Sequence, residues 1–167
     1  MVNTALIYIE NNDSYLMLHR VKKQQDYNKD KWIGIGGKFE NGETPEECVI
    51  REVLEETGLV INQKKLEYRG IVTFVCNDES EPGGIFTEYM HLFWTDSFTG
   101  TLIPSEDCKE GKLEWVLKSR MNELPHWKGD EIFLELIEKR VPFFSLKLVY
   151  KDGVLLEAVL NGKIIET

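Results

Sequence analysis

Runs of apolar and polar residues in alternation indicate that strands make up most of this chain. The first two runs, TALIYIE and SYLMLHRV, are rich in β-branched, aromatic and aliphatic side chains, and a turn-forming Asn-Asn-Asp separates them. The last two runs flank Lys-Asp-Gly, in which Asp-Gly is a hairpin signal. We predict strands at residues 4–10, 14–21, 66–76, 86–96, 112–117, 143–150 and 154–160.

Two segments have the spacing of helices. Residues 130–140 carry apolar side chains at three- and four-residue intervals. The other helix begins after Thr44, a suitable N-cap, with Pro45 at its first position and Glu47 completing a capping box. It runs to residue 57, where Gly58 can adopt the left-handed conformation that ends it, and Ile50, Val53 and Leu54 are its expected core face.

This order of elements predicts an α/β fold in which a mixed sheet is covered on both faces. At 167 residues the chain is long enough for one sizeable core, and it shows no repeat or interdomain linker. We therefore expect a single domain over residues 1–167.

Composition narrows the possible partners. A hydrophobic content of 42% is ordinary for a globular protein, and a net charge of −9 argues against binding a nucleic-acid polymer or an anionic membrane. No signal peptide or membrane-length apolar run is present, so we expect a cytoplasmic protein.

An acidic cluster on the first helix suggests chemistry. Glu52, Glu55 and Glu56 have i, i+3 and i+4 spacing, so their like charges share one face. A solvated acidic face is the simple interpretation. A divalent cation is the other, because Mg²⁺ prefers oxygen ligands and completes its shell with water and phosphates. The preceding Gly36-Gly37, which we expect to form a turn, lets backbone approach a ligand closely.

The full pattern of this stretch resembles a complete Nudix box. Its fixed positions are Gly37, Glu43, Arg51-Glu52-Val53, Glu55-Glu56 and Gly58-Leu59. The resemblance implies an α/β/α sandwich with a loop–helix motif, and an enzyme that hydrolyses nucleoside diphosphate-linked substrates with Mg²⁺ or Mn²⁺.

By position, the resemblance assigns roles within the box. The metal ligands are the Gly36 carbonyl, Glu52, Glu55 and Glu56, and Glu52 is a general base in some family members. Arg51 orients the glutamates, since a guanidinium fork suits fixed carboxylates. Glu43, which fixes the loop to the helix, and Gly58 are structural.

Family members often add a carboxylate from a later loop. By distance from Trp115 we prefer Glu110, followed by Asp107 and then Glu106, although an acidic surface loop is an equal alternative. Lys38, Arg20 or Lys23 could contact phosphate.

Outside the box the chain resembles the MutT-type oxidised purine nucleotide diphosphatases, especially their human-type members. The resemblance implies that Tyr27 and Phe74 contribute to an aromatic wall, that Trp127 stacks on the base, and that Asp130 reads its edge. Alternatively, Trp127 is a core residue and Asp130 a charge at a helix N-terminus. Gly37, Lys38 and Ile33 complete the expected substrate site.

Two positions depart from that group. Ile33 replaces an asparagine that hydrogen-bonds the base, and Gly129 replaces the first of two aspartates. Both departures remove polar groups that would contact the base. The sequence therefore does not predict whether the enzyme selects oxidised guanine, the base of 8-oxo-dGTP.

We expect a monomeric or homodimeric enzyme that hydrolyses purine (deoxy)nucleoside triphosphates to monophosphate and pyrophosphate, a reaction of nucleotide-pool sanitation and DNA repair. Alternatives are another nucleoside diphosphate-linked substrate, such as a nucleotide sugar or dinucleoside polyphosphate, and a non-catalytic nucleotide sensor.

Overall fold

The structure is a computed structural model that describes residues 1–22, 27–104 and 106–166. The strands are β1 (Val2–Asn11), β2 (Ser14–His19), β3 (Trp32–Ile33), β4 (Ile35–Lys38), β5 (Val60–Ile61), β6 (Glu67–Asn77), β7 (Ile85–Thr95), β8 (Phe98–Thr99), β9 (Lys112–Leu117), β10 (Phe144–Lys151), β11 (Val154–Leu160) and β12 (Lys163–Ile165). The helices are α1 (Pro45–Thr57) and α2 (Lys128–Glu138), with 3₁₀ turns η1 (Gln63–Lys65) and η2 (Lys118–Glu123).

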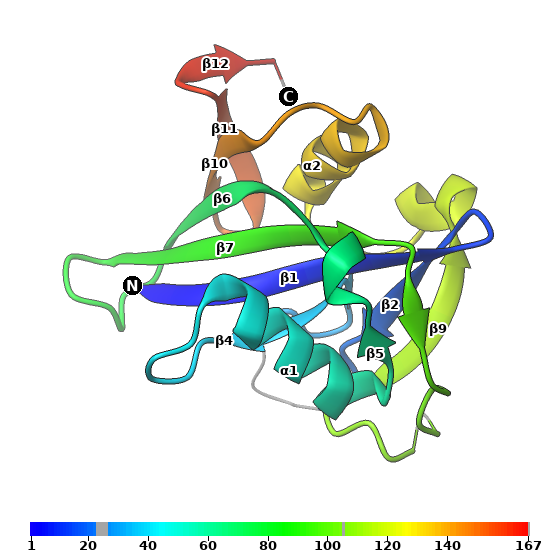
Figure 1. The fold of residues 1–167 in the computed structure, drawn as a ribbon. Coiled ribbons are helices and arrows are strands. Elements are labelled where there is room, and N and C mark those ends of the chain that lie inside the picture. Colours follow the sequence, from blue (N-terminus) through cyan, green and yellow to red (C-terminus); the bar gives the residue numbers. More distant parts are fainter. Residues whose placement is uncertain (23–26, 105, 167) are drawn as a thin grey trace.

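One mixed sheet organises these elements (Figure 1). Its strand order is β12-β11-β10-β6-β7-β1-β2-β3, while β4 pairs with β1 and β9 pairs with β2. The pairs β1–β7 and β10–β6 are parallel, and the other pairs in the sheet are antiparallel. Strand β1 is central because it pairs with β7, β4 and β2, and so connects both halves of the sheet.

The two faces of β1 belong to two different cores. Ala5, Ile7 and Ile9 are buried in the core that contains the apolar face of α1, whereas Tyr8 is buried in the core that contains α2. This alternation is the period-2 pattern of a strand covered on both faces. Helix α1 lies on one side of the sheet and α2 on the other (Figure 1), which confirms the predicted α/β/α sandwich.

Helix α1 starts and ends as its sequence predicts. The Thr44 hydroxyl accepts a hydrogen bond from the Glu47 backbone N–H (3.2 Å), and the Glu47 carboxylate accepts one from the Thr44 N–H (2.8 Å). Gly58 ends the helix with φ 76° and donates its N–H to the Leu54 carbonyl. These contacts satisfy backbone groups that a helix terminus leaves without intrahelical partners.

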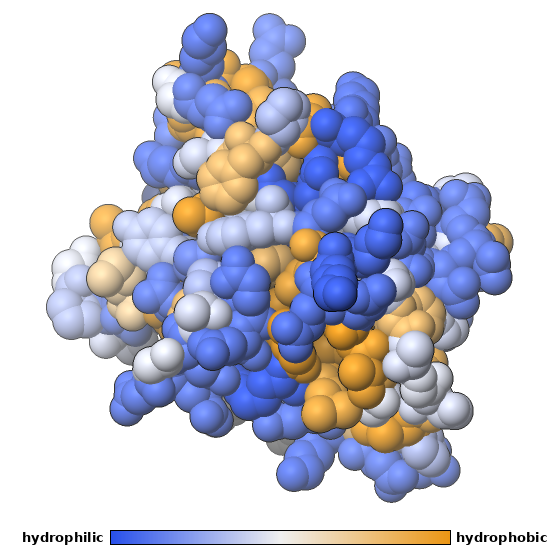
Figure 2. All heavy atoms as spheres, in the orientation of Figure 1, coloured by the Kyte–Doolittle hydropathy of each residue, from blue (hydrophilic) through white to orange (hydrophobic). Residues whose placement is uncertain are grey.

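The predicted core face of α1 is partly wrong. Cys48, Val49 and Val53 are buried, but Leu54 is 53% exposed, because it lies one residue round the helix from Val53 and turns away from the sheet. The side of the molecule that Figure 2 shows is largely hydrophilic. Hydrophobic surface gathers near the end of α1 and β5, where Leu54 and Val60 are exposed.

Gly36 and Gly37 do not form a turn, contrary to the prediction. They belong to β4 and pair with Leu6 and Ala5 of β1. The strand can lie this close because glycine has no Cβ. A Cβ on Gly36 would come within 2.0 Å of the Ala5 carbonyl oxygen. The turn comes after β4, so the strand presents its backbone beside Cys48, Glu52 and Glu56 of α1.

Other differences concern boundaries. The second strand ends at His19 rather than residue 21, and α2 begins at Lys128 rather than Asp130 and ends at Glu138. The closing hairpin forms as predicted, and a short third strand, β12, extends it. In the described residues no helix is long and apolar enough to span a membrane.

Thr44→Ala should lower the free energy of unfolding by about 1 kcal/mol, because the Glu47 N–H loses its acceptor. Urea denaturation measures this change, with Thr101→Ala, an exposed threonine in a loop, as the matched control. Equal effects of the two substitutions would show that the cap does not stabilise α1.

Candidate active site

A cavity of about 780 Å³ joins the two groups of residues singled out in the sequence. At one end it is lined by Gly36, Gly37, Lys38, Arg51, Glu52, Glu56 and Glu110. At the other end it is lined by Tyr27, Ile33, Phe74, Trp127 and Asp130. The strands of the sheet form its floor, so residues distant in the chain meet in one space.

Arg51 is the centre of the acidic end. Its Nε and Nη2 donate to the two carboxylate oxygens of Glu43 (2.6 and 2.9 Å), and its Nη1 donates to Glu52 (2.8 Å). Weaker contacts reach Glu55 (3.4 Å) and the Lys38 carbonyl (3.1 Å). One guanidinium therefore holds the loop and the helix together and offsets the repulsion between their carboxylates.

Glu43 is fixed from two sides, as its structural role requires. Besides the Arg51 fork, it accepts the backbone N–H of Glu40 (2.8 Å). The hydrogen bonds from Arg51, followed by that from Glu40, lower the pKa of Glu43 to about 2. The acid thus stays ionised over the working pH range of ordinary enzymes.

Gly37 makes room for Glu52. A Cβ at position 37 would lie 2.4 Å from the Glu52 carboxyl carbon, so a larger residue would push this carboxylate out of place. Glu52 is 15% exposed, whereas Glu55, one turn further round, is 60% exposed. Of the two, Glu52 is the one that lines the cavity.

Glu56 is the buried acid of the cluster. Its Oε2 has no hydrogen-bond partner and almost no solvent contact. Burial, and secondarily the charge of Glu52, raise the pKa of Glu56 to about 8, although a hydrogen bond from the Gly36 backbone partly offsets them. An orphaned carboxylate oxygen facing a second carboxylate is an arrangement that a bound cation would stabilise.

The residues fit a divalent cation with an open coordination shell. Within the part of the chain that the structure describes, no three His, Cys, Asp or Glu side chains lie close enough together to hold a metal ion. Mg²⁺ commonly takes one or two protein carboxylates and completes its shell with water and phosphate oxygens. Glu52 and Glu56 would hold the ion with the Gly36 carbonyl, and Glu55 would have to turn inward.

Of the three loop acids, the structure places Glu110 in the cavity. Its carboxylate pairs with Arg20 (2.8 Å), which also lines the cavity. Glu106 and Asp107 are exposed and do not line it. Lys38 lines the cavity beside Gly37, and Lys23 lies outside the described residues. Arg20, in its ion pair with Glu110, and Lys38 are thus basic residues that line the cavity near the glutamates.

Aromatic rings enclose the other end. Trp127 is the N-cap residue of α2, and its ring meets the edges of Phe74 (5.4 Å between centroids) and Tyr150 (5.1 Å). Its Nε1 donates to the Asn28 side chain (2.7 Å), which fixes the ring plane. Tyr27 stacks on Trp127 at 5.5 Å and is 51% exposed, so a base stacking on that face would replace Tyr27.

Asp130 lies at the cavity wall in the first turn of α2. It is only 8% exposed, and burial raises its pKa to about 8, opposed by the Trp127 backbone and the charge of Lys31. A neutral carboxyl at pH 7 can both donate and accept a hydrogen bond.

Packing explains why residue 129 is a glycine. A Cβ there would lie 2.4 Å from a Leu148 methyl and 2.7 Å from the Tyr150 hydroxyl, which accepts the Gly129 N–H. No larger residue fits at this position without rearrangement. Asp130 is therefore the acid that the start of α2 presents to the cavity.

Sequence reasoning missed five polar residues of this cavity: Thr4, Asn28, Glu40, Asp78 and Glu88. Thr4 and Glu88 lie inside strand patterns, where nothing in the sequence separates a cavity-facing polar side chain from a solvent-facing one. Only the register of β1 against β7 brings them together.

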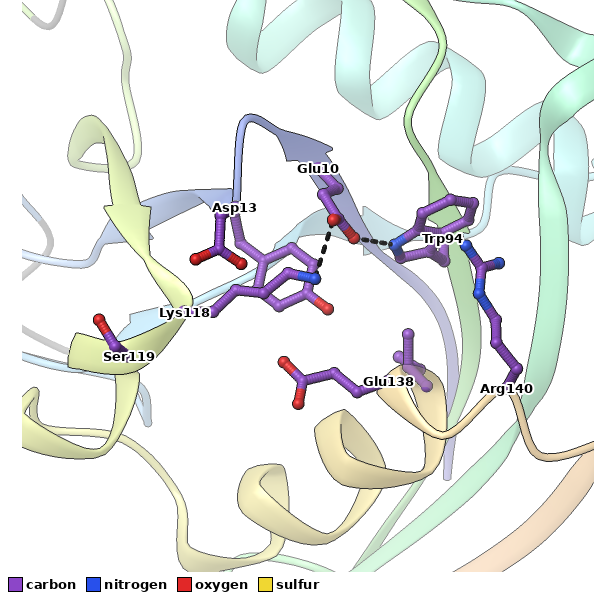
Figure 3. Close-up of a pocket in the computed structure, with 9 residues that line it drawn as sticks. Glu10, Asp13, Trp94, Lys118, Ser119, Glu138 and Arg140 are labelled. Atoms are coloured by element: carbon purple, nitrogen blue, oxygen red, sulfur yellow. Dashed lines mark hydrogen bonds and ion pairs between the residues drawn. The ribbon is translucent and has the colours of Figure 1, made fainter.

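A second pocket of about 510 Å³ lies at the opposite end of β1 (Figure 3). Three of its charged residues, Glu10, Lys118 and Arg140, already have ionic partners. Glu10 accepts from Trp94 Nε1 (3.0 Å) and pairs with Lys118 (2.8 Å), while Arg140 lies over Trp94 and pairs with Glu67. We regard this network as structural, since it ties the β1–β2 hairpin to β7 and the residues after α2.

Comparison with known proteins agrees with this geometry. The profile described as NUDIX domain matches residues 1–137, which include every box residue. The chain belongs to the Nudix family. It is 33% identical over 132 residues to the uncharacterized Nudix hydrolase YvcI of Bacillus subtilis (strain 168), covering 78% of this chain and 75% of that protein.

Two further relatives locate this Nudix hydrolase within the family. The oxidized purine nucleoside triphosphate hydrolase of Danio rerio is 26% identical over 139 residues, or 83% of each chain. The crystal structure of a MutT protein from Bacillus halodurans superposes with a TM-score of 0.81 at 27% identity, covering 98% of this chain and 99% of that one. The MutT-type fold therefore extends through β10–β12, beyond the matched profile.

Asp130→Asn should change how the stability of this Nudix protein depends on pH. Because the pKa of Asp130 is about 8 when folded and near 3.8 when unfolded, the folded chain holds an extra proton between these values. The free energy of unfolding therefore falls as pH rises from 4 to 8, by up to about 1.4 kcal/mol per pH unit from this one group.

Denaturation at pH 5 and pH 8 measures this difference. Asn cannot ionise, so Asp130→Asn should lose less stability over that interval than the wild type, whereas Asp96→Asn, an exposed control, should match the wild type. Parallel pH profiles for all three proteins would refute the raised pKa.

Proposed function

We propose that this Nudix hydrolase cleaves purine (deoxy)nucleoside triphosphates, oxidised ones such as 8-oxo-dGTP among them, to the monophosphate and pyrophosphate, with Mg²⁺ as its metal and Mn²⁺ as a substitute. Removal of such nucleotides would be a step of nucleotide-pool sanitation that protects DNA.

One observation carries this proposal: a single cavity connects the carboxylates to the aromatic rings. Glu52 and Glu56 line one end, and Trp127 and Asp130 line the other. A nucleoside triphosphate has the matching distribution of chemistry, with charged phosphates at one end and a flat base at the other. The relatives described as oxidized purine nucleoside triphosphate hydrolases support the same substrate class.

The residues of the acidic end divide the work of hydrolysis. A divalent cation, when bound, neutralises phosphate charge and activates water. Glu52 and Glu56 would hold it, and Arg51 keeps Glu52 in place through a hydrogen bond. Arg20 and Lys38 would bind phosphate oxygens, and Glu110, whose carboxylate pairs with Arg20, would accept a proton from the attacking water.

The residues of the other end bind the base. Trp127 supplies a stacking surface, and Asp130, protonated at neutral pH, donates a hydrogen bond to a purine acceptor and accepts one from a donor. Ile33 contributes only apolar contact. Because Tyr150 packs against Gly129 and leaves no room for a side chain there, α2 contributes one acid rather than two to recognition of the base.

A turnover screen with Mg²⁺ tests this function. The panel contains dGTP, 8-oxo-dGTP, dATP, ATP, nucleotide sugars and dinucleoside polyphosphates, and pyrophosphate release is measured separately from phosphate release. We expect pyrophosphate from the purine triphosphates. Hydrolysis of nucleotide sugars or dinucleotides instead would favour a different Nudix substrate, and no turnover on any compound would favour a sensor.

Glu56→Gln should reduce kcat by orders of magnitude and leave the fold intact, because an amide loses the charge that holds the cation. The matched control is Glu46→Gln, the same change at an exposed position in the first turn of α1. Full activity in Glu56→Gln would remove Glu56 from the metal site.

Asp130→Asn should change the ranking of bases in the same assay, because a permanent amide has fixed donor and acceptor groups. kcat/KM for guanine, 8-oxoguanine and adenine triphosphates measures the ranking. An unchanged order would place Asp130 outside base recognition.

A further inference from the structure

Glu88 is a mostly buried acid on the cavity floor, and neither the metal end nor the base end uses it. It lies on β7 directly opposite Phe74 of β6, and Phe74 in turn lies opposite Leu148 of β10. Directly paired residues project from the same face of a sheet. All three side chains line the cavity, so Glu88 stands beside the aromatic rings on a common floor.

The strand order places Glu88 between the two ends of the site. From the aromatic end to the phosphate end the strands are β6, β7, β1 and β4. Neighbouring strands are about 4.8 Å apart, so three steps span about 14 Å, which is the scale of a nucleotide from base to terminal phosphates. Glu88 of β7 and Thr4 of β1 occupy the middle of this span, where the sugar of a nucleotide would lie.

Thr4 fixes the Glu88 carboxylate in this position. Its hydroxyl donates to Glu88 Oε1 at 2.7 Å, and Thr4 itself is paired with Lys38 of β4. Burial raises the pKa of Glu88, and the hydrogen bond from Thr4 and the charge of Lys38 oppose that rise. A carboxylate can accept about four hydrogen bonds.

The negative charge and partial burial of Glu88 favour one kind of ligand group, a neutral hydroxyl. A phosphate would be repelled by the Glu88 carboxylate, and a stacked base is already held from its faces. A neutral hydroxyl, in contrast, gives a buried carboxylate a strong charge-assisted hydrogen bond. Carboxylates recognise ribose hydroxyls in this way in dinucleotide-binding folds.

We propose that Glu88, positioned by Thr4, accepts a hydrogen bond from a sugar hydroxyl of the bound nucleotide and is therefore a specificity-determining residue for the pentose. This inference rests on the proposed nucleotide substrate. Hydrogen bonding of Glu88 to an amino group of the base is the alternative that the experiment has to separate.

Equilibrium binding of nucleoside monophosphates tests the inference without requiring turnover. Calorimetry compares GMP, dGMP and 2′,3′-dideoxy-GMP, with AMP and dAMP as a second base series, on the wild type and on Glu88→Leu, which keeps the size but removes the acceptors. Glu157→Gln, an exposed acid on β11, is the control.

For the wild type, loss of the recognised hydroxyl should weaken binding about tenfold or more, the size expected for a hydrogen bond to a charged group. In Glu88→Leu the same loss should change the dissociation constant less than twofold. Thr4→Val should reduce the discrimination, and Thr4→Ser should restore it, which a purely structural role of Thr4 would not produce.

Pyrophosphate release from GTP, dGTP and dideoxy-GTP, measured in parallel, separates this inference from the proposed function. If monophosphates show the pattern but no triphosphate is hydrolysed, Glu88 keeps its role and the diphosphatase proposal fails. If triphosphates are hydrolysed but Glu88→Leu retains the wild-type hydroxyl dependence, or changes only the ranking of bases, the inference is overturned. If no nucleotide binds, both are overturned.

Discussion

The ion pairs of Arg51 are the interaction on which the rest of the site depends. Three carboxylates of one short segment, Glu43, Glu52 and Glu55, contact this one guanidinium. Without it their mutual repulsion would oppose both the loop and the first turns of α1. Glu56 lies outside this network with one buried oxygen that has no hydrogen-bond partner, and its raised pKa lets the carboxyl group carry a proton there.

The sheet supplies the second constraint, because it sets the distance between the acidic end and the aromatic end of the cavity. β4 carries the backbone beside the glutamates, and β6 and β10 carry the aromatic rings. The central strands β7 and β1 lie between them and contribute Glu88 and Thr4. In the proposed function the cation-binding residues lie on α1 and β4, with Arg20 and Glu110 from neighbouring loops, and the residues that contact the base and the sugar come from at least five other elements.

The sequence was most informative where function depends on local spacing. The capping box of α1, its Gly58 end and the spacing of Glu52 from Glu56 are all properties of one helix, so the pattern was sufficient. It was insufficient for Gly36-Gly37, which looked like a turn but form a strand, because the partner that makes glycine necessary is Ala5, 31 positions away. Glu88 could not be found for the same reason: its importance comes from strand register rather than from its neighbours in the chain.

We infer that the buried carboxylate of Glu56, beside Glu52, holds a divalent cation. Calorimetric titration of Mn²⁺ into the wild type and Glu56→Gln at pH 7 tests it most directly. We predict that the wild type binds Mn²⁺ with release of a proton, because Glu56 is protonated below about pH 8, and that Glu56→Gln binds at least about tenfold more weakly without that release. Equal Mn²⁺ affinity in the two proteins would contradict it.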